Sequence, residues 1–237
     1  VQPGGNLTMR FVLVIKRINP PVLLASRGYA KEDYRAMGAG LVVGGAIRNR
    51  GQVHIDHATF TGNQASSLGG AIYLDKQSFL GASNALFERN VATDGGGAIY
   101  MHLGSVARLS DCVFRENACS TGGGAISLYH SELHVANSDF THNNEEASQN
   151  EYDGGAIKAT GGMITVNSCT FMNNRASVSG AAIWADRTEV FMARSWFSCN
   201  EANLLGEPRP GLQVYISSPP DMAVQTSEFV PYEPRRM

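Results

Sequence analysis

The sequence has no excess of basic charge and no long apolar run. Its formal net charge is −2, with 19 Lys and Arg against 21 Asp and Glu, so it lacks the basic surface that nucleic acids and acidic membranes attract. The longest apolar run, around Phe11 to Ile15, is far shorter than the ~20 residues that span a bilayer. We therefore predict no nucleic-acid partner and no transmembrane segment.

Metal-binding motifs are also missing. None of the 6 histidines stands at metal-ligand spacing from a second ligand, and neither the EF-hand pattern nor the GGxGxDxUx pattern occurs. Acidic residues gather only between Asn144 and Asp153, where Glu145, Glu146 and Glu151 accompany Asp153. Because their spacing matches no calcium loop, we interpret them as a solvated inserted loop. We predict no metal and no cofactor.

What the sequence does contain is a repeat of two short motifs. A Gly-Gly-Ala-Ile tetrapeptide, altered to Gly-Ala-Ala-Ile in the last copy, recurs about every 27 residues, and a Phe-x-x-Asn follows each copy. A period of this length is typical of stacked supersecondary units. The motif isoleucines are Ile47, Ile72, Ile99, Ile126, Ile157 and Ile183. The second motif supplies Phe60, Phe87, Phe114, Phe140, Phe171 and Phe197, with Asn63, Asn90, Asn117, Asn143, Asn174 and Asn200.

The residues between the two motifs alternate in the way that strands do. The second residue after each isoleucine, and the seventh and fifth before each phenylalanine, are almost all apolar, so they share a buried face. Strands that repeat without a helical pattern between them bury such faces by winding into a right-handed parallel β-helix, with coils ~4.8 Å apart. We predict an all-β solenoid of about seven to eight coils, the last one degenerate from Val214 to Phe229.

In such a solenoid, residues at equivalent positions stack in columns along the axis. The six asparagines are expected to form a ladder in which each amide bonds the next, with the phenylalanine rings stacked beside it. The motif glycines allow a turn that a Cβ would forbid. These ladders predict a scaffold and not a ligand site.

The cysteines are expected to be free thiols. Cys112 and Cys169 fall in one column two coils apart, roughly 9 to 10 Å from each other, beyond the reach of a disulfide. Cys119 takes a position that is alanine in other repeats. We therefore predict small buried thiols at these three positions.

The pattern divides the chain into three regions. Residues 1–43 hold an N-terminal coil, in which Leu7 and Met9 fill the apolar columns, followed by an irregular capping segment. Residues 44–229 hold the repeats, and residues 230–237 form a proline-rich tail that caps the other end. Because the chain opens on Val1, we expect a processed or partial chain of a larger protein.

The paired GGA[ILV] and FxxN motifs resemble those of the polymorphic outer membrane protein (Pmp) repeats of chlamydiae. The resemblance covers roughly Gly44 to Asn200. In that family the repeats form β-helical domains that act as adhesins. The resemblance therefore implies an extracellular or cell-surface location and a binding or structural role.

The residue after each motif isoleucine belongs to an outward column that is rich in aromatic rings. Rings at coil spacing can stack on sugar faces or on an apolar partner, and basic residues nearby add to such patches. The alternative is cross-strand packing that only stiffens the sheet. The candidate binding residues are Tyr73, Tyr100, Trp184, Tyr215, Arg48 and Lys158.

The next outward column offers little for catalysis. Asp75 and His102 on neighbouring coils are its only acid/base pairing, and Tyr129 and His130 lie close enough to add to a shallow site. Asp186 lies four coils from Asp75, near 19 Å at ~4.8 Å per coil, too far for paired general acid and base. We predict no catalytic residues, with Asp75 and His102 as the candidates if the chain is an enzyme.

Three functions are compatible with these observations. The preferred one is a non-enzymatic surface or extracellular β-helix, adhesive or structural, that binds a protein or a glycan through the aromatic column. The second is an accessory subunit of a large assembly, or a self-associating one, that docks by an uncapped end or by insertions such as Ala202 to Pro210 with Leu204 and Leu205. The third is a carbohydrate-active enzyme, a polysaccharide lyase or hydrolase.

Overall fold

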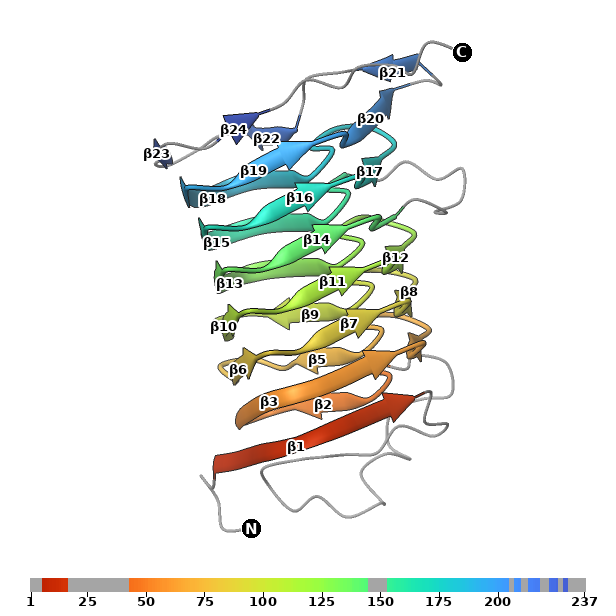
Figure 1. Cartoon of the computed structure of the whole chain (residues 1–237), viewed down its shortest axis with the longest axis vertical. Helices are drawn as coiled ribbons and strands as arrows, with labels where there is room; N and C mark the ends of the chain where they lie inside the picture. Colours follow the sequence, from red (N-terminus) through yellow and green to blue (C-terminus); the bar gives the residue numbers. More distant parts are fainter. Residues whose placement is uncertain are drawn as a thin grey trace.

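The strands of this protein stack along one long axis. The computed structural model describes residues 6–16, 43–144, 153–204, 207–209, 213–217, 222–225 and 228–229, which contain strands and no helix. β1 lies at one end of the stack and β22 to β24 at the other (Figure 1). The predicted all-β parallel solenoid is confirmed. The capping segment, most of the acidic loop, Leu205 and the tail lie outside the described residues.

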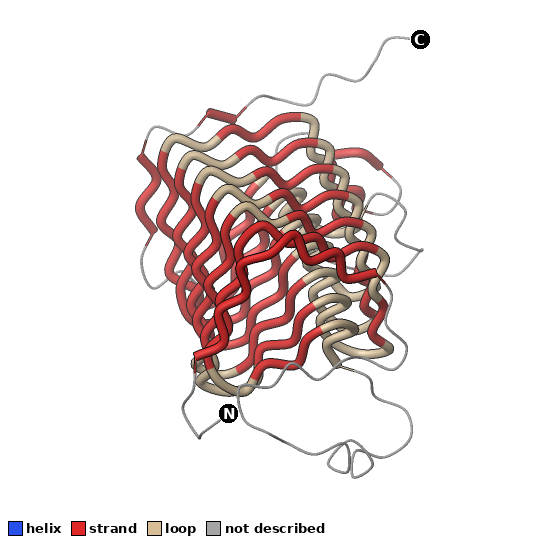
Figure 2. The backbone as a smooth tube through the Cα atoms, turned by 60° about the horizontal axis from the view of Figure 1, so that its bottom comes forward, coloured by secondary structure: helices blue, strands red, loops and turns tan. Residues whose placement is uncertain are grey.

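Each coil contributes strands to three rows, and Figure 2 shows the turns between rows gathered at the corners. The first row holds β2 (Ile47–Asn49), β5 (Ile72–Leu74), β9 (Ile99–His102), β22 (Val214–Ser217) and the first halves of β13 (Ile126–Ala136), β15 (Ile157–Asn167) and β18 (Ile183–Ala193). The second row continues β13, β15 and β18 and adds β1 (Asn6–Lys16), β3 (Gln52–Thr61), β6 (Phe79–Ser83), β10 (Val106–Ser110) and β23 (Met222–Gln225).

The third row carries the phenylalanines. It holds the end of β3 with β7 (Leu86–Glu88), β11 (Val113–Arg115), β14 (Asp139–Thr141), β16 (Thr170–Met172), β19 (Trp196–Ser198) and β24 (Glu228–Phe229). Shorter strands follow the asparagines, namely β4 (Gln64–Ala65), β8 (Val91–Ala92), β12 (Ala118–Cys119), β17 (Arg175–Ala176), β20 (Glu201–Leu204) and β21 (Glu207–Arg209). Among the described strands, only the β20–β21 pair is antiparallel.

The strand register confirms the predicted columns at both ends. β1 pairs with β3 so that Leu7 lies opposite Val53 and Met9 opposite Ile55. At the other end Val214 lies opposite Ile183, and Phe229 opposite Phe197. The apolar columns form one continuous core from Ala46 to Phe197, with most side chains fully buried. One polar member, Asn49, is satisfied by the Phe79 carbonyl and the Gly51 amide.

The asparagine ladder has the predicted form and a denser set of bonds than expected. Asn117 is representative: its Oδ1 accepts from the side-chain amide of Asn90 at 2.9 Å and from the Asn90 backbone amide at 3.0 Å. Its Nδ2 donates to the Phe87 carbonyl at 2.9 Å and to Asn143 Oδ1 at 3.1 Å. The ladder ends on Gln213, whose Oε1 accepts from Asn200 at 2.7 Å. The ladder therefore joins each coil to the coils on both sides.

The phenylalanine rings stack beside this ladder as predicted. Adjacent rings from Phe60 to Phe197 lie 4.7 to 4.9 Å apart and within 3° of parallel. This spacing equals the strand separation of a sheet, because each ring stands at the same place on successive coils. The stack fills the core behind the third row.

Two corners of the repeated coil turn through the left-handed backbone region, and glycine occupies only one of these positions, Gly62 with φ +65°. The residues three before each phenylalanine have φ between 48° and 55°: His57, Asn84, Asp111, Asn137, Ser168 and Arg194. A second set, two after the phenylalanine, has φ between 51° and 55°: Arg89, Glu116, His142, Asn173 and Cys199. These conformations are uncommon for residues other than glycine. The stacked coils therefore stabilise them despite their backbone strain.

The motif glycines meet a stronger restriction. Gly96 has φ +60°, and a Cβ on Gly97 would lie 2.1 Å from the Gly124 carbonyl oxygen of the next coil and 2.5 Å from the Ala118 oxygen. Both obstacles are backbone, so neither can move aside cheaply. Gly96 thus has the backbone shape that was predicted for this turn, and Gly97 allows, in addition, a close approach of successive coils.

All four cysteines are free, and three are buried as predicted. Cys112 donates to the Ser110 carbonyl at 3.2 Å, and on the next coil Ser138 makes the equivalent bond to the Ala136 carbonyl at 2.7 Å. Cysteine and serine are therefore interchangeable in this column. Burial raises the pKa of Cys112 to about 11.

Candidate functional site

The predicted binding residues lie in one column of the first row. Arg48 pairs with Tyr73, which pairs with Tyr100; the column continues through Ser127, Lys158, Trp184 and Tyr215. The structure therefore confirms the alignment that the repeat predicted.

The column is divided into two aromatic groups. Tyr73 and Tyr100 stack with ring centroids 5.7 Å apart and planes within 3°, and the Arg48 guanidinium lies 5.6 Å from the Tyr73 centroid. On later coils Lys158 Nζ lies 5.2 Å from the Trp184 ring, which stacks at 6.5 Å on Tyr215. Each group is thus a cation above a pair of rings, a favourable arrangement for the cation.

The column points outward as predicted, but parts of it are buried. Tyr73 is only 7% exposed and Ser127 6%, because the glycine-bearing turns fold against the column. A Cβ on Gly95 would lie 2.9 Å from the Tyr100 ring, and Ser127 Oγ donates to the Gly122 carbonyl and accepts from the Gly96 amide.

Burial changes the chemistry of these tyrosines. It raises the pKa of Tyr73 to about 12 and also raises the pKa of Tyr100. Both rings are therefore neutral hydrogen-bonding groups at physiological pH. They support the exposed rings of the next column.

The next outward column brings further rings against this pair. Tyr73 Oη and His102 Nδ1 lie 3.2 Å apart, and the His102 ring lies 6.4 Å from Tyr100 and 6.2 Å from Tyr129. Tyr129 is 40% exposed, and His130 stands edge-on to it at 4.5 Å. We refer to these five rings as the aromatic patch. It crosses the two columns that sequence reasoning had considered separately.

Asp75 and His102 do not form the acid/base pair that their columns suggested. Asp75 lies just beyond β5, where its Oδ2 accepts from Arg48 and Arg50, each at 3.0 Å. Burial alone would raise the pKa of Asp75, but the Lys76 amide and the two arginines outweigh burial and hold the pKa below its ordinary value. The carboxylate is therefore fixed in an ion pair, while His102 faces Tyr73.

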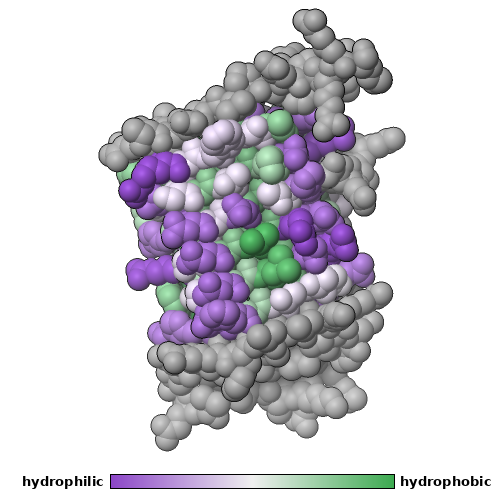
Figure 3. All heavy atoms as spheres, in the orientation of Figure 1, coloured by the Kyte–Doolittle hydropathy of each residue, from purple (hydrophilic) through white to green (hydrophobic). Residues whose placement is uncertain are grey.

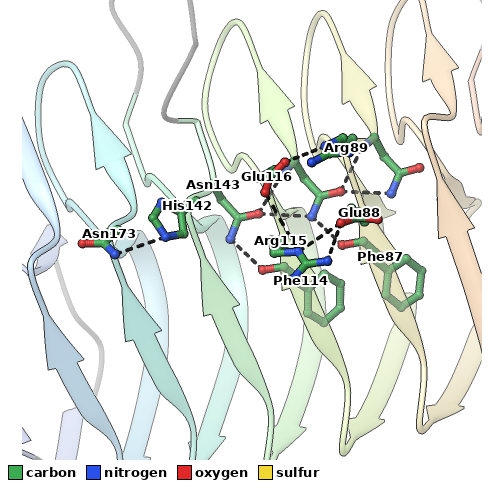
Figure 4. A network of polar contacts seen from close by, with 11 residues as sticks. Phe87, Glu88, Arg89, Phe114, Arg115, Glu116, His142, Asn143 and Asn173 are labelled. Carbon is green, nitrogen blue, oxygen red and sulfur yellow. Dashed lines mark hydrogen bonds and ion pairs between the residues drawn. The ribbon is translucent and has the colours of Figure 1, made fainter.

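The third-row face carries a charged network that sequence reasoning missed. Glu88 accepts from Arg115 Nε at 3.0 Å, and Glu116 accepts from Arg89 Nε at 2.6 Å, so two ion pairs cross between adjacent coils (Figure 4). Figure 3 shows hydrophilic side chains beside an apolar spot over β7 and β11. The sequence contained a signal for these ion pairs, because Glu88-Arg89 in one repeat is followed by Arg115-Glu116 at the same positions of the next.

Residues 43–215 match the family model described as right handed beta helix region. The chain belongs to the right-handed β-helix family. The match includes the six motif repeats and reaches Tyr215, so it covers both aromatic groups. Comparisons with curated proteins and with solved structures found no match.

Within this β-helix, the described residues contain no group of three His, Cys, Asp or Glu side chains placed to hold a metal ion. The described part of the chain also has no helix of the length and hydropathy needed to cross a bilayer. The arrangement best suited to contact a ligand is the aromatic patch, which offers exposed ring surface with hydrogen-bonding nitrogen and hydroxyl groups at its edge.

Proposed function

We propose that this β-helix is a non-enzymatic interaction module, adhesive or structural, that acts at the cell surface or outside the cell. The observation that carries the proposal is the aromatic patch, in which buried Tyr73 and half-buried Tyr100 support the exposed rings of Tyr129 and His130. Rigid rings lose little conformational entropy on binding, which favours them as contact residues. The Pmp resemblance supports the surface location.

The two carboxylates in the column of His102 and Tyr129, Asp75 and Asp186, favour binding over catalysis. A general acid needs a raised pKa and a general base needs a free carboxylate, whereas Asp75 has a lowered pKa and two arginine partners. Asp186 is hydrogen bonded to Arg187 Nε at 2.9 Å. Both acids are therefore suited to hold neighbouring side chains or ligand hydroxyls.

A second candidate function is docking onto a larger protein assembly. Trp196 is 50% exposed and Met172 38%, and they lie on adjacent coils of the third row, in β19 and β16. Tryptophan and methionine are enriched in protein interfaces. This pair supports an accessory subunit that binds by the third-row face.

Isolation of the protein under mild conditions, followed by mass spectrometry of the peptides and glycans that copurify, tests these proposals. The double variant Tyr129→Ala, His130→Ala removes the exposed part of the patch, and Trp196→Ala is the matched change on the third-row face. If the copurifying partner is lost from the double variant but retained by Trp196→Ala, the result supports the proposed function. If it is lost from Trp196→Ala but retained by the double variant, the result supports the accessory subunit. Polysaccharide cleavage that disappears in Asp75→Ala would overturn a non-enzymatic role.

A further inference from the structure

We propose that the third-row face binds the same face of a second copy of this chain, with the two solenoids antiparallel. The two-fold axis runs along the strand direction between the fourth and fifth coils, counting the coil of Phe60 as the first. The inference rests on the second candidate function, docking by the third-row face, and it names the partner as another copy. The aromatic patch lies outside this face.

The third-row face is flat, so its columns can align with those of a second copy. Successive phenylalanine rings behind it lie within 3° of parallel, whereas neighbouring strands of an ordinary sheet are rotated by about 20°. The strands of this row, from β7 to β19, pair without a shift of register. A two-fold axis along the strands would place each column against the same column of the other copy, with the order of the coils reversed.

Trp196 is the apolar anchor of the proposed contact. It is 50% exposed and stands directly before the phenylalanine of the sixth coil. The axis brings the sixth coil against the third, so Trp196 lies opposite half-buried Val113 of the other copy, in the apolar spot over β7 and β11 (Figure 3). Met172 on the fifth coil lies opposite Thr141 on the fourth. Each contact occurs twice by symmetry, and tryptophan is a typical interface anchor.

The charges of the face support this register. Asp111 and Arg194 are both exposed and occupy the same corner, on the third and sixth coils, so the axis brings Asp111 of each copy opposite Arg194 of the other. Within its own chain the Arg194 guanidinium donates to the neutral amide oxygen of Asn167, and a carboxylate adds Coulomb attraction. Nearer the axis Asp139 lies opposite Thr170, whose hydroxyl can donate to it.

Other arrangements of the two faces fit less well. An axis through the fourth coil places Asp139 against Asp139 of the other copy, a contact of like charges. A parallel arrangement exchanges the columns on either side of the phenylalanines. It places Arg115 against Val113 and Glu88 against Leu86, and charged groups are costly to bury against apolar ones. In the antiparallel register no like charges lie opposite each other among the third-row and corner residues of the third to sixth coils.

The size of the contact predicts a weak dimer. Four coils span about 19 Å along the solenoid, and six residues across the face span about 20 Å. Each copy therefore buries roughly 400 Å², about half of a standard interface. We expect a dissociation constant on the order of 10 to 100 μM.

Sedimentation and light scattering of the full chain, from about 5 to 500 μM, test the inference. The average mass should rise from that of one chain toward that of two. Trp196→Ala should weaken the dimer about tenfold or more, because the anchor is lost. Two controls should leave the dimer unchanged: Arg108→Asp, at an exposed arginine of the second row, and Tyr129→Ala, on the aromatic patch.

An exchange of charges tests the antiparallel register. Asp111→Arg places arginine opposite arginine, and Arg194→Asp places aspartate opposite aspartate, so each variant alone should stay monomeric. A mixture of the two variants should form a heterodimer, because both contacts then join opposite charges. The two corners have nearly the same backbone, with φ 54° and 50°, so each substitution introduces a residue that this conformation already carries. Thermal unfolding shows whether each variant folds.

The possible failures separate this inference from the proposed function. A wild-type chain that stays monomeric at about 500 μM overturns the inference, and docking of another protein on the third-row face is then decided by copurification with Trp196→Ala. A dimer that Trp196→Ala leaves intact overturns the site. A mixture of the two charge variants that stays monomeric overturns the register. The aromatic patch is tested separately by the double variant of Tyr129 and His130.

Discussion

The asparagine ladder makes a quantitative prediction through Asn117→Leu. Asn117 is fully buried and takes part in four side-chain hydrogen bonds. Leucine has a similar shape and removes all four. The buried Asn90 backbone amide then loses its acceptor, at a cost of about 1 to 3 kcal/mol, and each further lost bond costs about 1 kcal/mol. We expect the free energy of unfolding to fall by about 4 to 6 kcal/mol.

Urea unfolding followed by circular dichroism measures this loss, and amide hydrogen exchange localises it. The Asn90 amide proton should exchange much faster in Asn117→Leu, because its acceptor is gone. The matched control is Asn167→Leu, the same substitution on an outward position of β15, where the amide oxygen accepts from exposed Arg194 and from the hydroxyl of the neighbouring Ser168 at 3.2 Å. The control should change stability by about 0.5 kcal/mol or less.

Asn117→Asp tests the hydrogen-bond donors of the ladder, because it keeps the size and shape of the side chain and replaces the donating Nδ2 by an oxygen. The carboxylate can still accept from Asn90, but its second oxygen faces the Phe87 carbonyl and Asn143 Oδ1 and cannot donate to them. Burial and this repulsion raise the folded pKa of the carboxyl above its unfolded value of about 3.9. The destabilisation is therefore small below the unfolded pKa and grows as pH rises toward the folded pKa. A loss below 1 kcal/mol for Asn117→Leu, or no pH dependence for Asn117→Asp, would refute the reasoning.

Three further predictions concern the core and its thiols. Gly97→Ala should lower the thermal midpoint far more than Gly62→Ala, since a Cβ on Gly97 meets backbone at 2.1 Å and one on Gly62 meets nothing within 4 Å; equal shifts would contradict the close approach. Cys112→Ser should cost about 1 kcal/mol or less, because serine already makes the same bond one coil away; a loss near that of Asn117→Leu would be inconsistent with an interchangeable column. A thiol reagent at pH 8 should label only exposed Cys199 rapidly in the native protein, because burial raises the pKa of Cys112, Cys119 and Cys169, and rapid labelling of more than one thiol would refute this.

The repeat made the fold predictable, because the same residue type recurs at each column position on several coils. Six phenylalanines and six asparagines at one spacing predicted both ladders, and the apolar columns located Leu7, Met9 and Phe229 in register at the ends. The Gln213 cap of the ladder was not predicted, since it follows an insertion and matches no motif. The left-handed corners were missed because His, Asn, Asp, Ser and Arg share no side-chain property there.

The candidate site was only partly predictable. The column of Tyr73 and Tyr100 followed from counting, and so did the neighbouring position of His102. Their contacts did not, because side-chain direction and the position of the glycine turns depend on the assembled coils. The turns bury Tyr73, and the arginines of an adjacent coil engage Asp75.

The sequence by itself determined the period, the face of the strand on which each side chain lies and the stacking of like residues, because strand alternation and coil repetition are properties of local order. The tertiary structure alone decided which outward residues remain exposed and which polar groups meet. A side chain on one coil is covered or paired by atoms that lie about 27 residues away, and the distance between them is set only once the coils have stacked. The sequence repeat thus specifies the scaffold, whereas the aromatic patch forms only in the folded solenoid.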